Sequence, residues 1–189
     1  MIKNKRDLKE YLICDKNALG YSMKTRPRMG RDEIWRFEIL LRKYEYFSNL
    51  EKKNILQKVM YLFYKVRFHR LSVRLGFSIP INVFGKGLSI AHYGSIVVNS
   101  NAKVGDYCRI QENVTIGATG GTNDAPEIGD KVFIASGARI IGNVKIGNNI
   151  AIGANAVVVK DFLEDGITIA GIPAKKISNN DSHKFLRCH

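Results

Sequence analysis

The stretch IGDKVFIASGARIIGNVKIGNNIAIGANAVVV, residues 128–159, carries a branched aliphatic residue at every sixth position. The spacing continues upstream, so that the full series is Val104, Ile110, Ile116, Thr122, Ile128, Ile134, Ile140, Ile146, Ile152 and Val158. Helices repeat at about 3.6 residues and strands at about 2.0, so neither explains a period of six. The pattern predicts a solenoid: a mainly β, left-handed parallel β-helix in which three six-residue faces form one triangular coil.

Positions two residues before these aliphatics are also small or apolar, as a narrow interior requires. They are Ala102, Cys108, Val114, Val132, Ala138, Val144, Ile150 and Ala156. An earlier series, Phe84, Ile90 and Ile96, has the same period in another phase. The step from Ile96 to Val104 is eight residues, which predicts a bulge near Asn99 and Ser100.

His92 follows Ile90 by two residues, and this local phase places it on the outer surface beside a corner of the coil. The later phase would instead point it inward. A buried imidazole needs a polar partner, and the neighbouring sequence offers none, so the outward position is preferred.

Length and composition predict a two-part chain. An α-helical region is expected over residues 1–76, the β-helix over 77–177 and a mobile tail over 178–189. The N-terminus lacks the long apolar segment of a secretory signal, and no apolar run is long enough to span a bilayer. The cysteines, Cys14, Cys108 and Cys188, are odd in number and without metal-site spacing. A reduced cytoplasmic protein without disulfide or zinc is predicted.

Most of the net charge of +13 lies in the helical region. Helices are predicted over Lys5–Ala18, Asp32–Phe47 and Lys52–Leu75. The last has an apolar stripe, which comprises Ile55, Val59, Leu62, Phe63, Tyr64 and Val66. This stripe is expected to pack on the other helices and the end of the solenoid, with an open groove for a partner as the alternative. No nucleic-acid module is present, so the basic charge is attributed to an anionic acceptor, a membrane surface or cofactor phosphates.

Several segments carry a family resemblance. They are GLSIAHYGSIVV (87–98), IQENVTIGATGG (110–121), IGDKVFIASGARIIGNVKIG (128–147), IGANAVVVKD (152–161) and AGIPAKKI (170–177). Together they resemble the hexapeptide-repeat acyltransferases, in particular the serine acetyltransferases and their relatives from bacterial surface-polysaccharide gene clusters. The resemblance covers about Gly76 to Ile177 and implies a homotrimer with sites between subunits, which could pair into a dimer of trimers. It also implies acetyl transfer from acetyl-CoA to a hydroxyl.

His92 matches the catalytic histidine of that family. An alcohol is barely ionised at neutral pH, so an imidazole must accept its proton as the oxygen attacks the thioester. Backbone N–H groups in residues 117–121 are candidate donors to the resulting oxyanion. Cys108 falls in an inward position and is expected to be inert.

Acetyl-CoA is expected along the C-terminal coils. The positions that match the family's cofactor groove are Ala135, Gly153, Ala154, Ala170, Gly171, Lys175 and Lys176. Small residues allow a pantetheine arm to approach the backbone, and the two lysines would neutralise phosphate. No metal is predicted.

The chain also departs from the serine acetyltransferases. Ala91 stands where they have Asp, Phe77 where a carboxylate supports the histidine, and Ala125 where a second histidine serves the amino-acid acceptor. Glu112 and Asp124 are therefore candidates to bind the acceptor or to orient His92.

These departures favour a sugar or glycan of surface polysaccharide as the acceptor. Serine O-acetylation, N-acetylation of an amino sugar and a non-catalytic structural solenoid are the alternatives.

Overall fold

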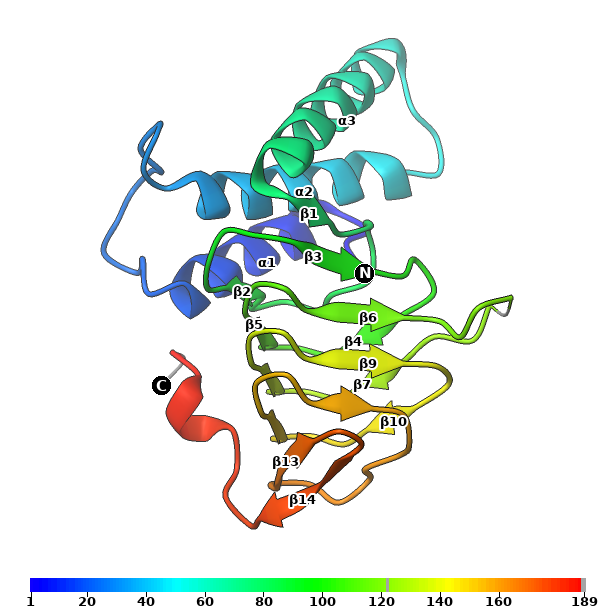
Figure 1. Ribbon diagram of the computed structural model, residues 1–189. Coiled ribbons are helices and arrows are strands. Elements are labelled where there is room, and N and C mark those ends of the chain that lie inside the picture. Colours follow the sequence, from blue (N-terminus) through cyan, green and yellow to red (C-terminus); the bar gives the residue numbers. More distant parts are fainter. Residues whose placement is uncertain (122, 188–189) are drawn as a thin grey trace.

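The computed structural model describes residues 1–121 and 123–187, so Thr122, Cys188 and His189 lie outside the described residues. The cap consists of α1 (Lys5–Ala18), α2 (Glu33–Asn49) and α3 (Ile55–Leu75), stacked above one end of a β-helix (Figure 1). Helix α3 begins three residues later than predicted, because Asn54 and Gln57 form a reciprocal capping box at its start. The left-handed Gly76 (φ 79°) ends it, and the first strand follows at once.

The β-helix is built from short strands that stack in register. They are β1 Phe77–Ser78, β2 Ser89–Ile90, β3 Ile96–Val98, β4 Lys103–Val104, β5 Arg109–Ile110, β6 Thr115–Gly117, β7 Glu127–Ile128, β8 Phe133–Ile134, β9 Arg139–Ile141, β10 Lys145–Ile146, β11 Ala151–Ile152, β12 Val157–Val158, β13 Thr168–Gly171 and β14 Ala174–Ser178. They form three faces, in the orders β1-β3-β6-β9-β12, β4-β7-β10 and β2-β5-β8-β11-β13-β14. Pairing is parallel except at β13–β14, where the chain turns back and closes the end.

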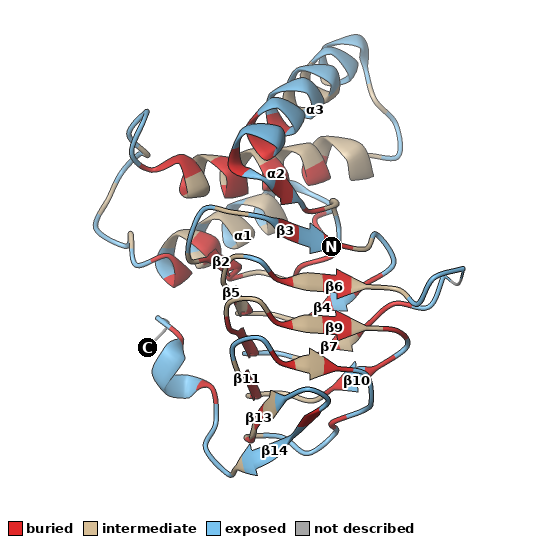
Figure 2. Ribbon diagram, viewed as in Figure 1, coloured by how far each residue is buried: buried red, intermediate tan, exposed pale blue. Residues whose placement is uncertain are grey.

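The predicted interior is confirmed (Figure 2). Every described position of the six-residue series, and every companion position two residues earlier, is at most 5% exposed. Aliphatic side chains thus fill the shaft from the cap to the last coil. Burial of this continuous apolar column is what stabilises the solenoid.

One hexad of the series is not a face of the coil. Val104 pairs with Ile128, 24 residues later, whereas Ile128 pairs with Ile146 after 18. The segment between β6 and β7 therefore contains six extra residues, which leave the coil as a projecting loop (Figure 1). An insertion of one hexad preserves the six-residue spacing without adding a face, and Thr122, the position of the series in this segment, lies outside the described residues.

The predicted bulge also lies elsewhere. Ile90 pairs with Ile110 across 20 residues, but Val98 already pairs with Ile116 across 18. The two extra residues therefore lie between β2 and β3, in the corner formed by residues 91–95, and not near Asn99 and Ser100. Val98 is as well buried as Ile96, so either residue satisfies the sequence pattern.

The packing of α3 differs from the expectation. Its buried face, with Phe68, Leu71 and Leu75, packs toward α2 and the first coil. The predicted packing of the stripe that begins at Ile55 was wrong, because most of that stripe is solvent-exposed (Figure 2). The sequence has apolar residues on two sides of this helix, and the structure buries the side that carries Phe68, Leu71 and Leu75.

Residues 179–187 lie against the β-helix and do not leave it. Ser182 Oγ donates to the Lys131 carbonyl at 2.5 Å, and the ring of Phe185 stacks on Phe133 with centroids 4.6 Å apart. Leu186 is buried beside them. The prediction of a mobile tail was therefore wrong over these residues, which pack against the β-helix.

Candidate active site

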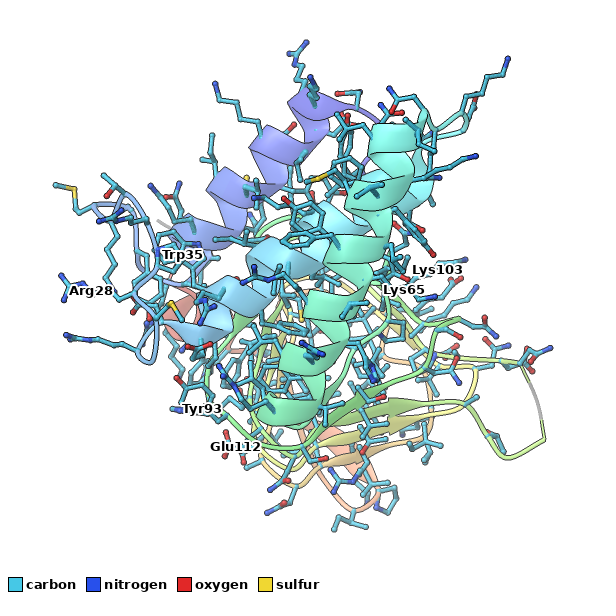
Figure 3. All side chains as sticks on the ribbon, turned by 90° about the horizontal axis from the view of Figure 1, so that it is seen from above. Arg28, Trp35, Lys65, Tyr93, Lys103 and Glu112 are labelled. Carbon is cyan, nitrogen blue, oxygen red and sulfur yellow. The ribbon has the colours of Figure 1, made fainter. Side chains whose placement is uncertain are left out.

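The corner of residues 91–95 presents His92 to solvent, in agreement with the outward position inferred from its local phase. The corner lies against the end of α3, since the Gly94 N–H donates to the Leu75 carbonyl at 3.4 Å. Figure 3 shows Tyr93 and Glu112 near this end of the helix. The candidate base therefore lies where the cap meets the first coil.

Buried carboxylates of the cap hold the strand that leads to His92. Asp15 Oδ1 accepts from the Gly87 and Leu88 N–H groups at 2.7 and 2.9 Å, and Glu38 Oε1 accepts from the Ile90 N–H at 3.1 Å. Parallel pairing to β5 fixes the other edge of β2. The sequence did not identify these two residues, because nothing in a helical pattern shows which charged residue turns inward.

Arg42 adds further contacts between the cap and the first coil. It is fully buried and donates to Asp15 at 2.7 Å, to Glu45 at 3.0 Å, and to the Phe84 and Gly85 carbonyls. One guanidinium thus links α1, α2 and the first coil. The position of the His92 corner therefore depends on the fold of the cap.

Glu112 lies one coil below the corner that carries His92. A Cβ added to Gly94 would come within 3.1 Å of the Glu112 Cβ, so the two corners are in close contact. Ser136, one coil further, donates to Glu112 Oε1 at 2.5 Å. The Oε2 atom is buried and accepts no hydrogen bond from residues 1–121 or 123–187.

The environment keeps Glu112 ionised. The hydrogen bond from Ser136 is the main reason that the pKa of the Glu112 carboxyl lies below its usual range, and His92 contributes a smaller favourable charge interaction. A carboxylate with one fixed oxygen and one unoccupied oxygen is suited to accept a hydrogen bond from an imidazole. Ser136 was not among the predicted site residues, and only the strand register shows that it stacks beneath Glu112.

The small candidate cofactor residues lie along the edge of the β-helix that carries His92 and Glu112. This edge is formed where the chain leaves the stacked strands β2, β5, β8, β11 and β13. Ala135 follows β8, Gly153 and Ala154 follow β11, and Ala170 and Gly171 end β13, all in one stack of strands. From the coil of β2 to that of β13 there are four strand spacings, or about 19 Å. A Cβ on Gly153 would meet the Ala170 Cβ at 2.8 Å. Position 153 therefore has no room for a side chain against Ala170, and the groove itself stays a prediction.

Lys175 and Lys176 lie on exposed β14, paired with Ala170 and Ile169 of β13. Lys176 also forms an exposed ion pair with Glu164 at 2.6 Å. Both amines are thus at the end of the edge that starts at His92.

Asp124 is not brought to His92 within one chain. The corner of residues 91–95 precedes β3, whereas the loop that carries Asp124 follows β6, which pairs with β3 in parallel. The two segments therefore lie at opposite edges of one face (Figure 1). The glycines at 117, 120 and 121, predicted as oxyanion donors, lie at the same distant edge.

The other predicted positions agree with structural roles. Phe77 is buried, with its ring centroid 5.0 Å from that of Phe37, so its place in the core excludes a carboxylate there. Cys108 lies inside the shaft, where burial raises the pKa of its thiol to about 12. Its thiol is therefore protonated at neutral pH and inert.

A cleft beside the corner carries charges of both signs. It has a volume of about 560 Å³ and is lined by Met29, Gly30, Glu33, Arg36, Arg74, Leu75 and Tyr93. Glu33 accepts from Arg36 at 2.7 Å and from Arg74 at 2.5 Å. Hydrogen bonds from Gly30 and Arg36 outweigh the effect of burial and hold the pKa of Glu33 below its usual range. In the described part of the chain, no three His, Cys, Asp or Glu side chains are grouped as a metal site would need.

Comparisons with known proteins agree with the repeat. A family model described as bacterial transferase hexapeptide (six repeats) matches residues 125–160. The serine acetyltransferase of Synechococcus elongatus is 40% identical over 95 residues, which are 49% of this chain and 38% of that protein. The serine acetyltransferase of Staphylococcus aureus strain Mu50 is 42% identical over 91 residues, or 47% and 42% of the two chains. The matches thus span less than half the length of these curated relatives.

Solved structures extend the likeness to the cap. The serine acetyltransferase of Neisseria gonorrhoeae has a TM-score of 0.65 at 27% identity, over 93% of this chain and 68% of that one. The coenzyme A complex of the Brucella abortus strain S19 enzyme has a TM-score of 0.70 at 25% identity, over 93% and 70%. The chain therefore has a hexapeptide repeat and shares the left-handed β-helical fold of these structures. More particularly, it is similar to serine acetyltransferases over the matched regions.

Proposed function

We propose that the protein is an acetyl-CoA-dependent O-acetyltransferase in which His92 is the general base. The observation that carries the proposal is the edge of the β-helix itself. An exposed imidazole lies at its upper end, an ionised Glu112 lies directly below, and small residues continue to the last coil. The donor would lie along this edge with its thioester toward the cap.

The proposed reaction needs only proton transfer and acyl transfer. Neutral His92 accepts the proton of the acceptor hydroxyl while the oxygen attacks the thioester carbonyl carbon. The tetrahedral intermediate collapses, the carbon–sulfur bond breaks, and the imidazolium returns the proton to the departing thiolate. The products are an acetyl ester and coenzyme A.

Glu112 is proposed as a positioning residue for His92. Its unoccupied Oε2 can accept a hydrogen bond from one ring nitrogen, which would leave the other nitrogen free to act as base. Ser136 would hold the carboxylate in place through Oε1. This arrangement would supply the support that the resemblance assigns, in serine acetyltransferases, to a carboxylate at the position of Phe77.

A homotrimer is proposed as the functional unit. The His92 corner and the loop with Asp124 lie at opposite edges of one face, so the site of one chain lacks that loop. Threefold association of the β-helices would bring the edge of one subunit against the opposite edge of the next. The neighbour's Asp124 and glycine-rich loop would then reach the acceptor.

Serine is the acceptor that the relatives support best, because the curated matches are serine acetyltransferases. This favours the alternative prediction over a glycan. The cleft beside Tyr93 adds a structural reason, since the Arg74 guanidinium can pair with the carboxylate of an amino acid. Arg74 is 61% exposed and therefore accessible to a ligand.

A glycan hydroxyl is the second candidate, on one specific observation. Ala125 and Pro126 are buried in the projecting loop, and no residue between Gly117 and Glu127 is basic. A free amino acid would therefore find no cation on that loop.

The test is release of coenzyme A thiol from acetyl-CoA, measured with serine and with a panel of sugars, nucleotide sugars and capsule oligosaccharides. His92→Ala is expected to lower kcat by about 10² to 10⁴. His183→Ala, which removes an exposed histidine outside the edge, is the matched control. Turnover of serine alone supports the first acceptor, and turnover of a sugar alone supports the second. Activity that survives in His92→Ala would overturn the assignment of the base.

Glu112→Gln tests the positioning role separately. It is expected to lower kcat by up to about a hundredfold while the KM for acetyl-CoA is unchanged. A kcat equal to that of the wild type would show that Glu112 does not position the base.

A further inference from the structure

Helix α3 carries a second apolar face that the fold does not cover. Ile55, Val59, Leu62, Val66 and Val73 follow one another at steps of three, four or seven residues, which places them on one side of the helix. Their exposed fractions are 81%, 58%, 58%, 43% and 68%. Leu56 and Phe63 widen this side and are also exposed. These seven residues are called the outer face of α3.

Basic residues border the outer face along both edges. By helical spacing, Lys58 and Lys65 lie on one edge, Arg67 lies on the other, and Arg70 interrupts the face near its C-terminal end. Residues 55–75 contain no acidic side chain. Figure 3 views the cap from above and shows α3 in front of the other helices, with Lys65 beside it. The outer face is therefore both apolar and strongly cationic.

A groove continues this face toward α2. It has a volume of about 750 Å³, and its walls are Arg36, Leu40, Val59, Leu62, Phe63, Val66, Arg67, Arg70, Leu71 and Arg74. The Arg67 guanidinium lies 5.2 Å from the Phe63 ring centroid, so cation and apolar surface are in contact. The groove thus combines an apolar floor with several guanidinium groups.

We propose that the outer face of α3 docks on an anionic phospholipid bilayer, with the helix lying in the plane of the interface. An amphipathic helix with aliphatic and Phe side chains on one side and Lys and Arg at its borders is typical of interfacial binding. Each basic residue near an anionic leaflet adds a further attraction. No helix in the described residues is long and apolar enough to cross a bilayer, so the contact is with the surface.

Charge decides between this occupant and a second copy of the chain. Two copies of α3 packed through the outer face would bring Lys58, Lys65 and Arg70 of each helix near those of the other, with no acidic residue on either helix to offset the repulsion. Phosphate groups of lipids would instead pair with these side chains. The long stems of Lys and Arg can also lie along the acyl region while their charges stay at the headgroups.

Docking in this way would bring the candidate active site close to the membrane. The Gly94 N–H donates to the Leu75 carbonyl at the end of α3, so the corner that carries His92 is fixed to the docked helix. The docking itself does not depend on the proposed acetyl transfer and is tested without it.

The test is flotation of the full-length protein with vesicles of phosphatidylcholine alone or of phosphatidylcholine with phosphatidylglycerol. Binding is expected only with the anionic lipid, and it should weaken as salt is raised. Lys58→Gln/Lys65→Gln removes two charges from the border and should lower the partition coefficient about thirtyfold. Lys5→Gln/Lys9→Gln, with the same charge change on α1, should retain most of the binding.

A second variant tests the apolar part. Val59→Ser/Leu62→Ser alters two exposed side chains and should abolish flotation while far-ultraviolet circular dichroism and the urea midpoint are unchanged. Equal binding to neutral vesicles, or equal loss in the α1 control, would overturn the proposal. So would an absence of flotation. If, in addition, sedimentation showed that Val59→Ser/Leu62→Ser dissociates an oligomer, the outer face would be assigned to a second copy of the chain.

Discussion

The cap and the β-helix bury different kinds of side chain. Each charged residue that is buried in the described structure belongs to the cap, and this set is Asp15, Asp32, Glu33, Glu38, Arg42 and Glu45. In the described residues of the β-helix and the C-terminal segment, the buried polar side chains are Ser89 and Ser182. A repeated coil can fill its interior with one class of residue, whereas the cap depends on particular pairs of charges. The two regions should therefore fail in different ways when a side chain is changed.

The largest loss of stability is expected from Arg42→Met. This change leaves Asp15 and Glu45 buried without their main partner, and breaking a buried pair typically costs about 3–5 kcal/mol. Urea unfolding followed by circular dichroism measures the loss. Lys103→Met, which removes an equal charge from an exposed pair with Glu127 on the β-helix, should produce no measurable change. Equal effects of the two changes would contradict the contrast between the regions.

Truncation of a buried side chain inside the β-helix should give the next largest loss of stability. Ile140 is fully buried between the coils of Ile116 and Val158, so Ile140→Ala should lower the free energy of unfolding by about 2–5 kcal/mol. Leu62→Ala shortens a side chain of similar size on the outer face of α3 and should change the free energy of unfolding by less than about 0.5 kcal/mol. A large loss in Leu62→Ala would mean that the outer face is covered in solution.

A smaller effect tests how tightly the coils stack. A Cβ on Gly105 would lie 2.7 Å from the carbonyl carbon of Gly129 in the next coil, so Gly105→Ala should cost about 1–3 kcal/mol. Gly120 lies in the projecting loop, where an added Cβ meets nothing within 4 Å. Gly120→Ala should therefore leave the thermal midpoint unchanged, and a matching loss there would show that the loop is packed.

The sequence predicted the interior of the β-helix well because each shaft position repeats the same environment. It could not predict which hexads form faces, since an inserted hexad at the loop after β6 and an eight-residue step before β3 both leave a plausible aliphatic series. Only pairing between coils shows that Val98, and not Ile96, occupies the stacked position above Ile116. The interpretation of His92 as an outward residue did not depend on this choice.

The cap was less predictable for two physical reasons. Helix α3 is apolar on two sides, so periodicity alone cannot decide which side is buried. The buried network requires residues far apart in the sequence, such as Asp15 and Arg42, to meet at one point. For the same reason the candidate site could be read only in part from the sequence: His92 and the small residues follow from motifs, whereas Ser136, Asp15 and Glu38 are found only from contacts.

The last prediction concerns Glu38, a buried carboxyl of the cap whose Oε2 accepts no hydrogen bond from the described residues. Burial, with a further contribution from the nearby Asp15, raises the pKa of Glu38 well above its ordinary value of 4.5. The folded protein then holds a proton that the unfolded chain releases, so the free energy of unfolding falls as the pH rises above about 4.5. Glu38→Gln resembles the protonated side chain and keeps an oxygen for the Ile90 N–H. Its stability should equal that of the wild type at pH 4 and exceed that of the wild type at pH 8. Parallel stability profiles of the two proteins between pH 4 and 8 would show that Glu38 is ionised in the fold, and that the cap compensates its buried charge as fully as that of Arg42.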